Sequence, residues 1–303
     1  MTPVAVRSYD HPTDFERVGR LLVDAYRPGD RLPVWLESRW EYMHFHPLIV
    51  GQPIDRFGVA EQDGRIVGIV HFEDNPAINF LQVRPGHEPA IPPLLDWAEH
   101  RLGGTSRRFG PGTLGIVVNE FDGALREAVR VRGFVEHPEV AEESSSLELG
   151  PALPEVALPA GFRLQSLAEE DDLRKVSRVL WRGFDHGDEP PDEDVAGRAL
   201  AHSAPKFRRD LTIVAVEPGG QYAAFSGMWF MPENAVAYVE PVATDPAFRR
   251  LGLGRAAVLE SLRRVRALGA RVAWVGSDLP FYRALGFELR YRSPLWVRTL
   301  SGG

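Results

Sequence analysis

The apolar and polar positions of the chain repeat one order of secondary-structure elements in its two halves. Each half opens with a short strand pattern, continues with apolar residues at helical spacing, and then gives two strands around a tight glycine turn. The predicted ranges are 4–8, 13–26, 57–61 and 65–72 in the first half, and 162–165, 169–184, 212–217 and 222–230 in the second. A repeated order over such distances indicates an internal duplication.

The closing elements of the two halves also correspond. A further strand is predicted at 77–83 and at 235–244, and each half then gives a helix, a strand, a short helix and a final strand. Both short helices end in a Gly-Phe pair, at 133–134 and at 286–287. Hairpins combined with strand–helix–strand steps predict an α+β (mixed α/β) fold, in which each half has a mixed, mostly antiparallel sheet flanked by helices.

A proline-rich stretch separates the two halves. Residues 151–160 carry little helix or strand signal, which is typical of a linker. We therefore expect one domain at 1–150, a linker at 151–160 and a second domain at 161–303.

Composition narrows the class of function. The formal net charge of −7 disfavours a nucleic-acid-binding protein and favours a cationic small substrate. The absence of cysteine excludes disulfides, thiol nucleophiles and thiolate metal sites, and it fits a reducing compartment. No apolar run reaches the roughly 20 residues of a membrane span, and the N-terminus lacks the pattern of a signal peptide. We expect a cytoplasmic protein that binds neither membrane nor metal.

A glycine-rich turn in the second half carries the clearest chemical signal. It follows an apolar strand and opens a predicted helix whose apolar residues share one face. Gly252 and Gly254, two residues apart, let the backbone approach an anion and direct successive N–H groups at it. The helix N-terminus favours negative charge, and Arg249, Arg250 and Arg255 add charge-assisted donors. This combination predicts a pyrophosphate site.

The same glycines fit two other interpretations. Gly252-x-Gly254-x-x-Ala257 satisfies the dinucleotide-binding fingerprint, and Asp278 lies about 20 residues further on, where a ribose-binding acid is expected. Against an NAD-dependent oxidoreductase, the preceding strand ends near Thr244, whereas the turn of a Rossmann fold leaves its strand directly. The third interpretation is a tight turn that binds no ligand.

Two linked motifs resemble the GNAT superfamily of N-acetyltransferases. The Arg-x-x-Gly-x-Gly sequence at 249–254, after a strand ending in Val-Ala-Thr-x-Pro at 242–246, looks like the coenzyme A signature of that family. Residues 272–287 resemble its later strand and Tyr-x-x-x-Gly-Phe element. The resemblance covers 156–303, and the repeated element order extends it to two tandem GNAT-like domains. It implies transfer of an acetyl group from acetyl-CoA to a primary amine of a small molecule or peptide, by direct attack on the thioester.

The resemblance also assigns the contacts with acetyl-CoA. The main chain at the end of the strand would pair with the pantetheine arm, and the amides of the glycine loop would hold the pyrophosphate. Many relatives carry an asparagine after the strand at 272–276, where this chain has no asparagine, and Ser277 or Asp278 would have to substitute. The expected acetyl-CoA-binding residues are Val242, Ala243, Thr244, Arg249, Arg250, Leu251, Gly252, Leu253, Gly254, Arg255 and Ser277.

Tyr282 and Glu240 are the predicted catalytic residues. Acyl transfer to an amine requires that the ammonium lose a proton and that the leaving thiolate gain one. Tyr282 matches the family position of the general acid, and its reference pKa near 10 suits a donor at neutral pH. Glu240 precedes the pantetheine-binding stretch, and apolar neighbours could raise its pKa enough for a general base. A packed core tyrosine and an ion-paired structural glutamate are the alternatives.

The acceptor contacts are expected between the first two helices of the second half. Residues 181–189 mix aromatic and acidic side chains, which suits a cationic, partly apolar amine, although a solvated acidic loop gives the same pattern. Trp229 either lines this pocket or fills the core. We expect the chain to act as a monomer or a homodimer.

The first half keeps the predicted fold without the functional residues. In its corresponding loop the arginine pair and the Gly-x-Gly are replaced by prolines, which supply no N–H, and Glu88 would repel phosphate. Aligning the two Gly-Phe pairs places Val129 opposite Tyr282, and Asn79 falls opposite Glu240. We interpret the first half as a GNAT-like pseudo-domain. A coenzyme A-binding sensor or scaffold, in which both sites have decayed, is the non-enzymatic alternative.

Overall fold

The chain divides into two compact units, which we call the N-terminal and C-terminal units. The computed structural model describes residues 3–29, 35–151 and 153–300. The N-terminal unit comprises Met1–Met43, Leu48–Ser144 and Arg290–Gly303, and the C-terminal unit comprises His44–Pro47 and Ser145–Leu289.

Each unit completes its sheet with a strand from the other half of the sequence. The last strand of the chain, β13 (Glu288–Thr299), runs antiparallel to β6 (Gly110–Val117) of the N-terminal unit. The end of β7 (Val135–Glu148) runs antiparallel to β12 (Val272–Val275) of the C-terminal unit. Trp296 of β13 is buried in the N-terminal core, so the exchanged strand contributes to its hydrophobic packing. The units are therefore made of interleaved rather than consecutive segments.

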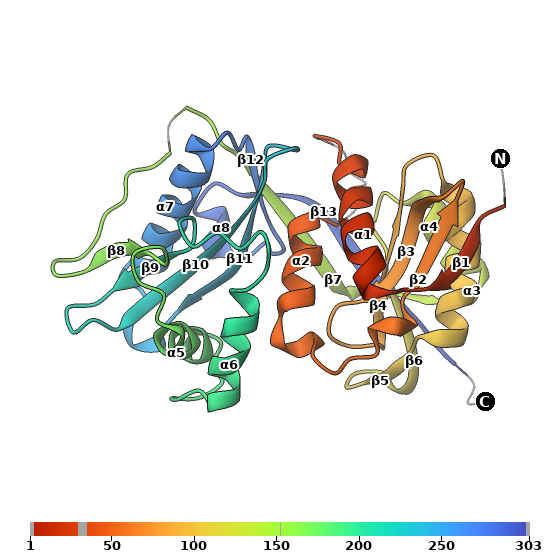
Figure 1. Ribbon diagram of the computed structural model, residues 1–303, viewed down its shortest axis with the longest axis horizontal. Helices are drawn as coiled ribbons and strands as arrows, with labels where there is room; N and C mark the ends of the chain where they lie inside the picture. The colour runs from red at the N-terminus through yellow and green to blue at the C-terminus, as the bar shows by residue number, and fades with distance from the viewer. Residues whose placement is uncertain (1–2, 30–34, 152, 301–303) are drawn as a thin grey trace. The chain divides into compact units, whose positions relative to one another are not determined.

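The N-terminal unit is a mixed sheet with the strand order β1-β2-β3-β4-β6-β13, and β5 pairs with β6. Strands β4 and β6 run parallel, and the other strand pairs named here are antiparallel. The remaining elements are β1 (Ala5–Ser8), α1 (His11–Ala25), α2 (Glu37–Phe45), β2 (Gly58–Gln62), β3 (Arg65–Phe72), β4 (Ile78–Val83), α3 (Ile91–Arg101), β5 (Gly104–Ser106) and α4 (Gly123–Val131) (Figure 1).

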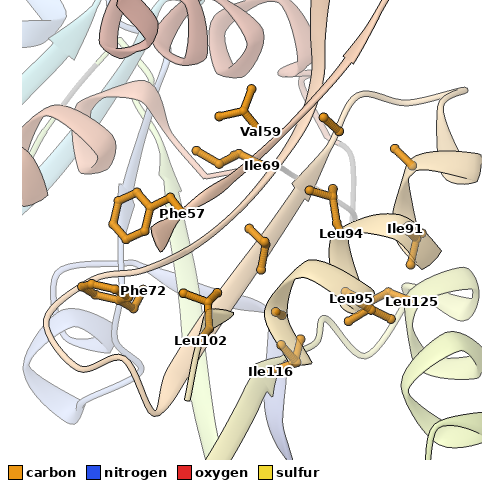
Figure 2. Close-up of a cluster of buried hydrophobic side chains, with 14 of the residues drawn as sticks. Phe57, Val59, Ile69, Phe72, Ile91, Leu94, Leu95, Leu102, Ile116 and Leu125 are labelled. Carbon is orange, nitrogen blue, oxygen red and sulfur yellow. The ribbon is translucent and has the colours of Figure 1, made fainter. Parts of the chain in front are cut away.

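An apolar core holds the N-terminal unit together. Phe57, Val59 and Ile69 come from the first hairpin and its entrance, and they share a buried cluster with Leu94 and Leu95 of α3, as Figure 2 shows. These five side chains are almost completely removed from water. The N-terminal unit thus has a hydrophobic core of its own, whatever its function.

The C-terminal unit is a mixed sheet with the strand order β8-β9-β10-β11-β12, followed by the end of β7. Strands β11 and β12 run parallel, and the other pairs are antiparallel. No helix in the described ranges is both long and apolar enough to cross a membrane. The remaining elements are β8 (Arg163–Ser166), α5 (Leu173–Gly183), α6 (Asp192–Ala201), β9 (Ile213–Val216), β10 (Tyr222–Met231), β11 (Val236–Thr244), α7 (Leu253–Ala267) and α8 (Pro280–Arg283).

Different helices cover the two faces of the C-terminal sheet. Val258 and Leu262 of α7 pack in one cluster with Met228 and Val239 of β10 and β11. Helix α5 packs in a separate cluster that includes Phe225 of β10. This separation follows from the alternation of side chains along a strand, which sends neighbouring residues to opposite faces. The apolar face predicted for the helix after the glycine loop is therefore buried against the sheet.

The two units repeat one strand register. Ser8 of β1 lies opposite Gly58 of β2, and Ser166 of β8 lies opposite Ile213 of β9, so each unit opens with the same antiparallel pair. The following strands, β3 and β10, each carry a register shift close to their start. The α+β fold, with two mostly antiparallel mixed sheets flanked by helices, is confirmed.

Candidate active site

Strands β11 and β12 separate part of the way along β11. The parallel pairing runs from Val236 opposite Val272 to Tyr238 opposite Trp274, and β12 ends one residue later. Strand β11 continues to Thr244 and pairs there with β10 on its other side. In the register that the structure describes, the last residues of β11 therefore have one edge without a strand neighbour. Unpaired main-chain groups on such an edge can bond an extended ligand.

A β-bulge marks the point where the strands separate. Ser226 of β10 lies opposite Val242, but Met228 lies opposite Val239, so Gly227 faces the two residues Glu240 and Pro241. The peptide bond between them is cis. A side chain at Gly227 would not fit, because its Cβ would lie 2.7 Å from the carbonyl carbon of Glu240. The Nε1 group of Trp229 donates to the carbonyl oxygen of Glu240 at 3.0 Å, which fixes the bulge from the neighbouring strand.

The glycine loop follows β11 and ends in the first turn of α7. Asp245 accepts a hydrogen bond from the N–H of Ala247 at 2.9 Å and so caps a short 3-10 turn. Arg250 and Gly252 then adopt left-handed backbone conformations, with φ of 68° and 80°. Gly252 is the N-cap residue of α7 and has no side chain to bond the first helical amides. These amides are consequently available to an anion.

The two glycines of the loop have different roles. A Cβ at Gly252 would meet no atom within 4 Å, so the space beside the helix start is open. A Cβ at Gly254 would lie 2.6 Å from Oγ1 of Thr244 and 3.7 Å from the ring of Phe281. Gly254 therefore allows α7 to pack closely on the end of β11, a contact that sequence spacing alone does not show.

Two arginines of the predicted pyrophosphate cluster also make protein contacts. Arg255 donates from Nη1 to the carbonyl oxygen of Ala284 at 3.1 Å. Arg249 donates from Nη2 to the carbonyl oxygen of Gly183 at 2.9 Å and to Oδ1 of Asp185 at 3.0 Å. Arg250, with its left-handed backbone, lies on the loop itself. Two of the three arginines of the loop thus bond groups at the end of α5 and after α8.

A buried carboxylate beneath the loop was not identified from sequence. Asp245 is 1% exposed and accepts hydrogen bonds from Arg182 at 2.7 Å and from Arg178 at 3.3 Å, both on α5. Burial alone would raise the pKa of Asp245, but the bonds from Arg182 and from the N–H of Ala247 hold it below its usual value. This charged network ties α5 to the start of the loop.

Tyr282 lies on α8, within the buried cluster on the α7 face of the sheet. Its ring makes edge contacts with Phe281 and Phe287, with centroids 5.0 and 5.9 Å away. Burial raises the pKa of the Tyr282 hydroxyl, and the negative charge of Glu240 raises it further. The hydroxyl is therefore protonated throughout the neutral range. The two predicted catalytic residues lie close enough to interact electrostatically.

The turn before α8 is held by an ion pair. Asp278 is 5% exposed, and Arg283 binds both of its carboxylate oxygens, with Nε 2.7 Å from Oδ1. Ser277 accepts a hydrogen bond from the N–H of Leu279 through Oγ at 3.3 Å. Asp278 thus stabilises the turn that carries Tyr282, whereas the dinucleotide interpretation requires it to bind a ribose.

The segment predicted to contact the acceptor connects α5 and α6. Trp181 lies edge-on to His186, with ring centroids 5.0 Å apart, and the Phe184 side chain is 48% exposed. Trp229 is 4% exposed, and its ring centroid lies 6.0 Å from that of Phe207. Trp229 is therefore buried and supports the bulge. The segment itself exposes an aromatic side chain to solvent, that of Phe184.

The corresponding loop of the N-terminal unit is built differently. Helix α3 has proline at Pro92 and Pro93, so two amides of its first turn are missing. Glu88 accepts a hydrogen bond from the N–H of Gly86 at 3.0 Å, which places a carboxylate in this loop. A negative charge and missing donors both disfavour a phosphate.

The structure refines the correspondence between the two catalytic positions and the first half. The N–H of Phe134 bonds the carbonyl oxygen of Val129 at 3.1 Å, as the N–H of Phe287 bonds that of Tyr282, so Val129 does correspond to Tyr282. The match of Asn79 with Glu240 is wrong. The pair β3–β4 has the same register as the pair β10–β11. In this register Phe80 of β4 occupies the position at which β11 bulges, where Glu240 lies. One extra residue in a bulge shifts an ungapped alignment, and its presence is not visible in the sequence.

An open strand edge leads into an uncapped helix N-terminus, which suits a ligand with an extended arm followed by a diphosphate, and a buried tyrosine interacts there with a glutamate. Residues 173–287 match the model of the Acetyltransferase (GNAT) family. The matched segment lies within the C-terminal unit and is similar to a GNAT acetyltransferase domain, and both curated relatives below are named as acetyltransferases.

Two curated relatives are similar to the chain in sequence, and a solved structure is similar to it in fold. The chain is 29% identical over 157 residues to glucosamine 6-phosphate N-acetyltransferase of Trypanosoma brucei brucei, covering 51% of this chain and 88% of that protein. It is 30% identical over 148 residues to mycothiol acetyltransferase of Saccharomonospora viridis, covering 45% of this chain and 48% of that protein. A tandem GNAT protein from the clavulanic acid biosynthesis pathway has the same fold, with a TM-score of 0.67, 18% identity and 99% of each chain covered. The tandem fold predicted from the repeat is thereby confirmed.

Proposed function

We propose that the chain acetylates a primary amine of a small molecule at one acyl-CoA site, located in the C-terminal unit. The observation that carries this proposal is the junction of β11 and α7, where an open strand edge leads into an uncapped helix start. A side chain at Gly252 would enter open space there, so the loop can admit an anion. A coenzyme A molecule presents the matching sequence of groups, an extended amide-containing arm followed by a diphosphate.

The residues that would hold acetyl-CoA follow from this junction. Val242, Ala243 and Thr244 offer main-chain groups to the pantetheine arm, and the amides from Arg250 to Arg255 offer donors to the diphosphate. When bound, acetyl-CoA supplies the activated acetyl thioester. Ser277 stands at the end of the diverging β12 and is a further candidate for the pantetheine arm.

Tyr282 and Glu240 supply the proton-transfer groups. Tyr282 keeps its proton at neutral pH because burial and the charge of Glu240 raise its pKa, so its hydroxyl can donate to the leaving thiolate. Glu240 lies at the bulge where the strands separate. Its carboxylate can accept, directly or through water, the proton that the acceptor's ammonium loses, so that the neutral amine attacks the thioester. An N–H of the neighbouring main chain donates a hydrogen bond to the thioester oxygen as it becomes anionic.

A small amine is the acceptor class that the available observations support. The names of two curated relatives refer to glucosamine 6-phosphate and mycothiol, which are small molecules. The segment between α5 and α6 offers acidic and aromatic side chains, including the exposed Phe184, to a cationic acceptor. The net charge of −7 supports such a substrate over nucleic acid, and we place the enzyme in the cytoplasm as a monomer or homodimer.

A panel of primary amines incubated with acetyl-CoA tests this function through release of the free thiol. We expect one class of small amine, such as amino sugars, polyamines or amino acids, to give thiol release well above the rate without acceptor. If coenzyme A raises the melting temperature but no class of amine is acetylated, the sensor or scaffold alternative is favoured. Stabilisation by NAD instead of coenzyme A would contradict the proposal altogether.

A further inference from the structure

Arg249 divides its donors between the glycine loop and the segment that connects α5 to α6. Its Nη2 group bonds the carbonyl oxygen of Gly183 and Oδ1 of Asp185, and its Nε group lies 3.4 Å from the carbonyl oxygen of Thr244. Among the described residues, its Nη1 group has no hydrogen-bond partner. The side chain is 43% exposed, so the free side of the guanidinium fork is accessible to an anion at the loop.

The end of α5 is fixed, in contrast to the segment that follows it. A Cβ at Gly183 would lie 2.7 Å from Cβ of Ala243, so the helix end packs directly on β11. Beyond it, the side chains of Asp185, Asp188 and Glu189 are 70%, 93% and 68% exposed, and each pairs with an arginine. Exposed ion pairs contribute little to stability, so we expect the α5–α6 segment to undergo local unfolding at a low cost in free energy.

We propose that Arg249 is a positioning residue that couples the glycine loop to the α5–α6 segment. The Nη2 side of its guanidinium holds Gly183 and Asp185, while the Nη1 side takes a phosphate oxygen. A bound diphosphate immobilises the Arg249 side chain, and the segment bonded to that side chain opens less often. The inference rests on the proposed acyl-CoA site and adds how occupancy of that site is transmitted to the acceptor side.

Hydrogen exchange of the intact protein, with and without coenzyme A, tests the coupling. We expect coenzyme A to slow exchange in residues 184–189 of the wild type by roughly three- to tenfold, since the segment then opens less often. Asp185→Asn removes the charge that pairs with Arg249 but keeps an oxygen acceptor, so we expect this slowing to fall by at least half. The Kd for coenzyme A measured by calorimetry should stay within about threefold, because Asp185 bonds Nη2 and the phosphate is proposed to bond Nη1. Asparagine suits this position, because Asp185 has a φ of 59° and asparagine tolerates left-handed backbone.

Asp188→Asn is the matched control in the same segment. Asp188 pairs with Arg182 of α5 at 2.6 Å, whereas Arg249 pairs with Asp185, so loss of the Asp188 charge should leave the slowing intact. Coenzyme A that binds wild type without slowing the segment, or equal slowing in Asp185→Asn, would overturn the coupling alone. A wild type that binds no coenzyme A would overturn the proposed function together with it.

Discussion

Replacing Tyr282 with phenylalanine is expected to lower kcat by about a hundredfold, while the KM for acetyl-CoA changes by less than about threefold. The hydroxyl is proposed to protonate the leaving thiolate, so it contributes when the carbon–sulfur bond breaks and not when the substrate binds. A thiolate can also leave without assistance, which puts the effect at the low end of the roughly 10²–10⁴-fold range of general acid catalysis. Steady-state kinetics with the acceptor found in the amine panel measures both parameters.

Tyr222→Phe is the matched control for this variant. Tyr222 is another buried tyrosine of the C-terminal unit, and its hydroxyl donates to the carbonyl oxygen of Glu170 at 2.9 Å. Its loss should cost about 1 kcal/mol of stability with kcat unchanged. An unchanged kcat in Tyr282→Phe, with the protein folded by its melting curve, would remove this tyrosine from the mechanism.

Replacing Gly252 with valine is expected to weaken coenzyme A binding by roughly 10- to 100-fold, the equivalent of one lost hydrogen bond to a charged group. The new side chain would enter the open space beside the first turn of α7, where the diphosphate is proposed to bind. Valine also disfavours the left-handed backbone of this position, at a cost of roughly 1–3 kcal/mol. Calorimetry gives the Kd, and a melting curve gives the loss of stability.

Gly269→Val separates the two effects. Gly269 follows the other end of α7, has a φ of 102°, and also meets no atom within 4 Å of an added Cβ. The Gly269→Val protein should therefore lose a similar amount of stability without any loss of affinity for coenzyme A. Gly254→Val is not a suitable test, because its side chain would collide with Thr244. Normal binding by folded Gly252→Val would mean that the loop is only a turn.

The sequence predicts the order of elements well because that order is encoded locally. Helical and strand periodicities, glycine turns and the Gly-Phe pairs each depend on a few consecutive residues. The exchange of β7 and β13 between the units is different. An alternating strand pattern fits the edge of either sheet, so the choice of partner is made by tertiary packing, such as the burial of Trp296.

The same distinction applies to the candidate site. The glycine loop and Tyr282 are recognisable because a motif of fixed spacing carries them. The ion pairs of Asp245 with α5, the contact of Gly254 with Thr244 and the bond from Arg249 to Asp185 join residues distant in sequence, and no local pattern marks them. The bulge opposite Gly227 adds one residue to β11, which is why counting along the chain misplaced the first-half counterpart of Glu240.

Calorimetric titration of the whole chain with acetyl-CoA tests the central claim most directly. The account predicts one molecule bound per chain, since the C-terminal loop presents free helical amides and the N-terminal loop presents Pro92, Pro93 and Glu88. It also predicts that this single binding event is severely weakened in Gly252→Val. Two equivalent sites per chain, or one site that Gly252→Val leaves intact, would contradict it.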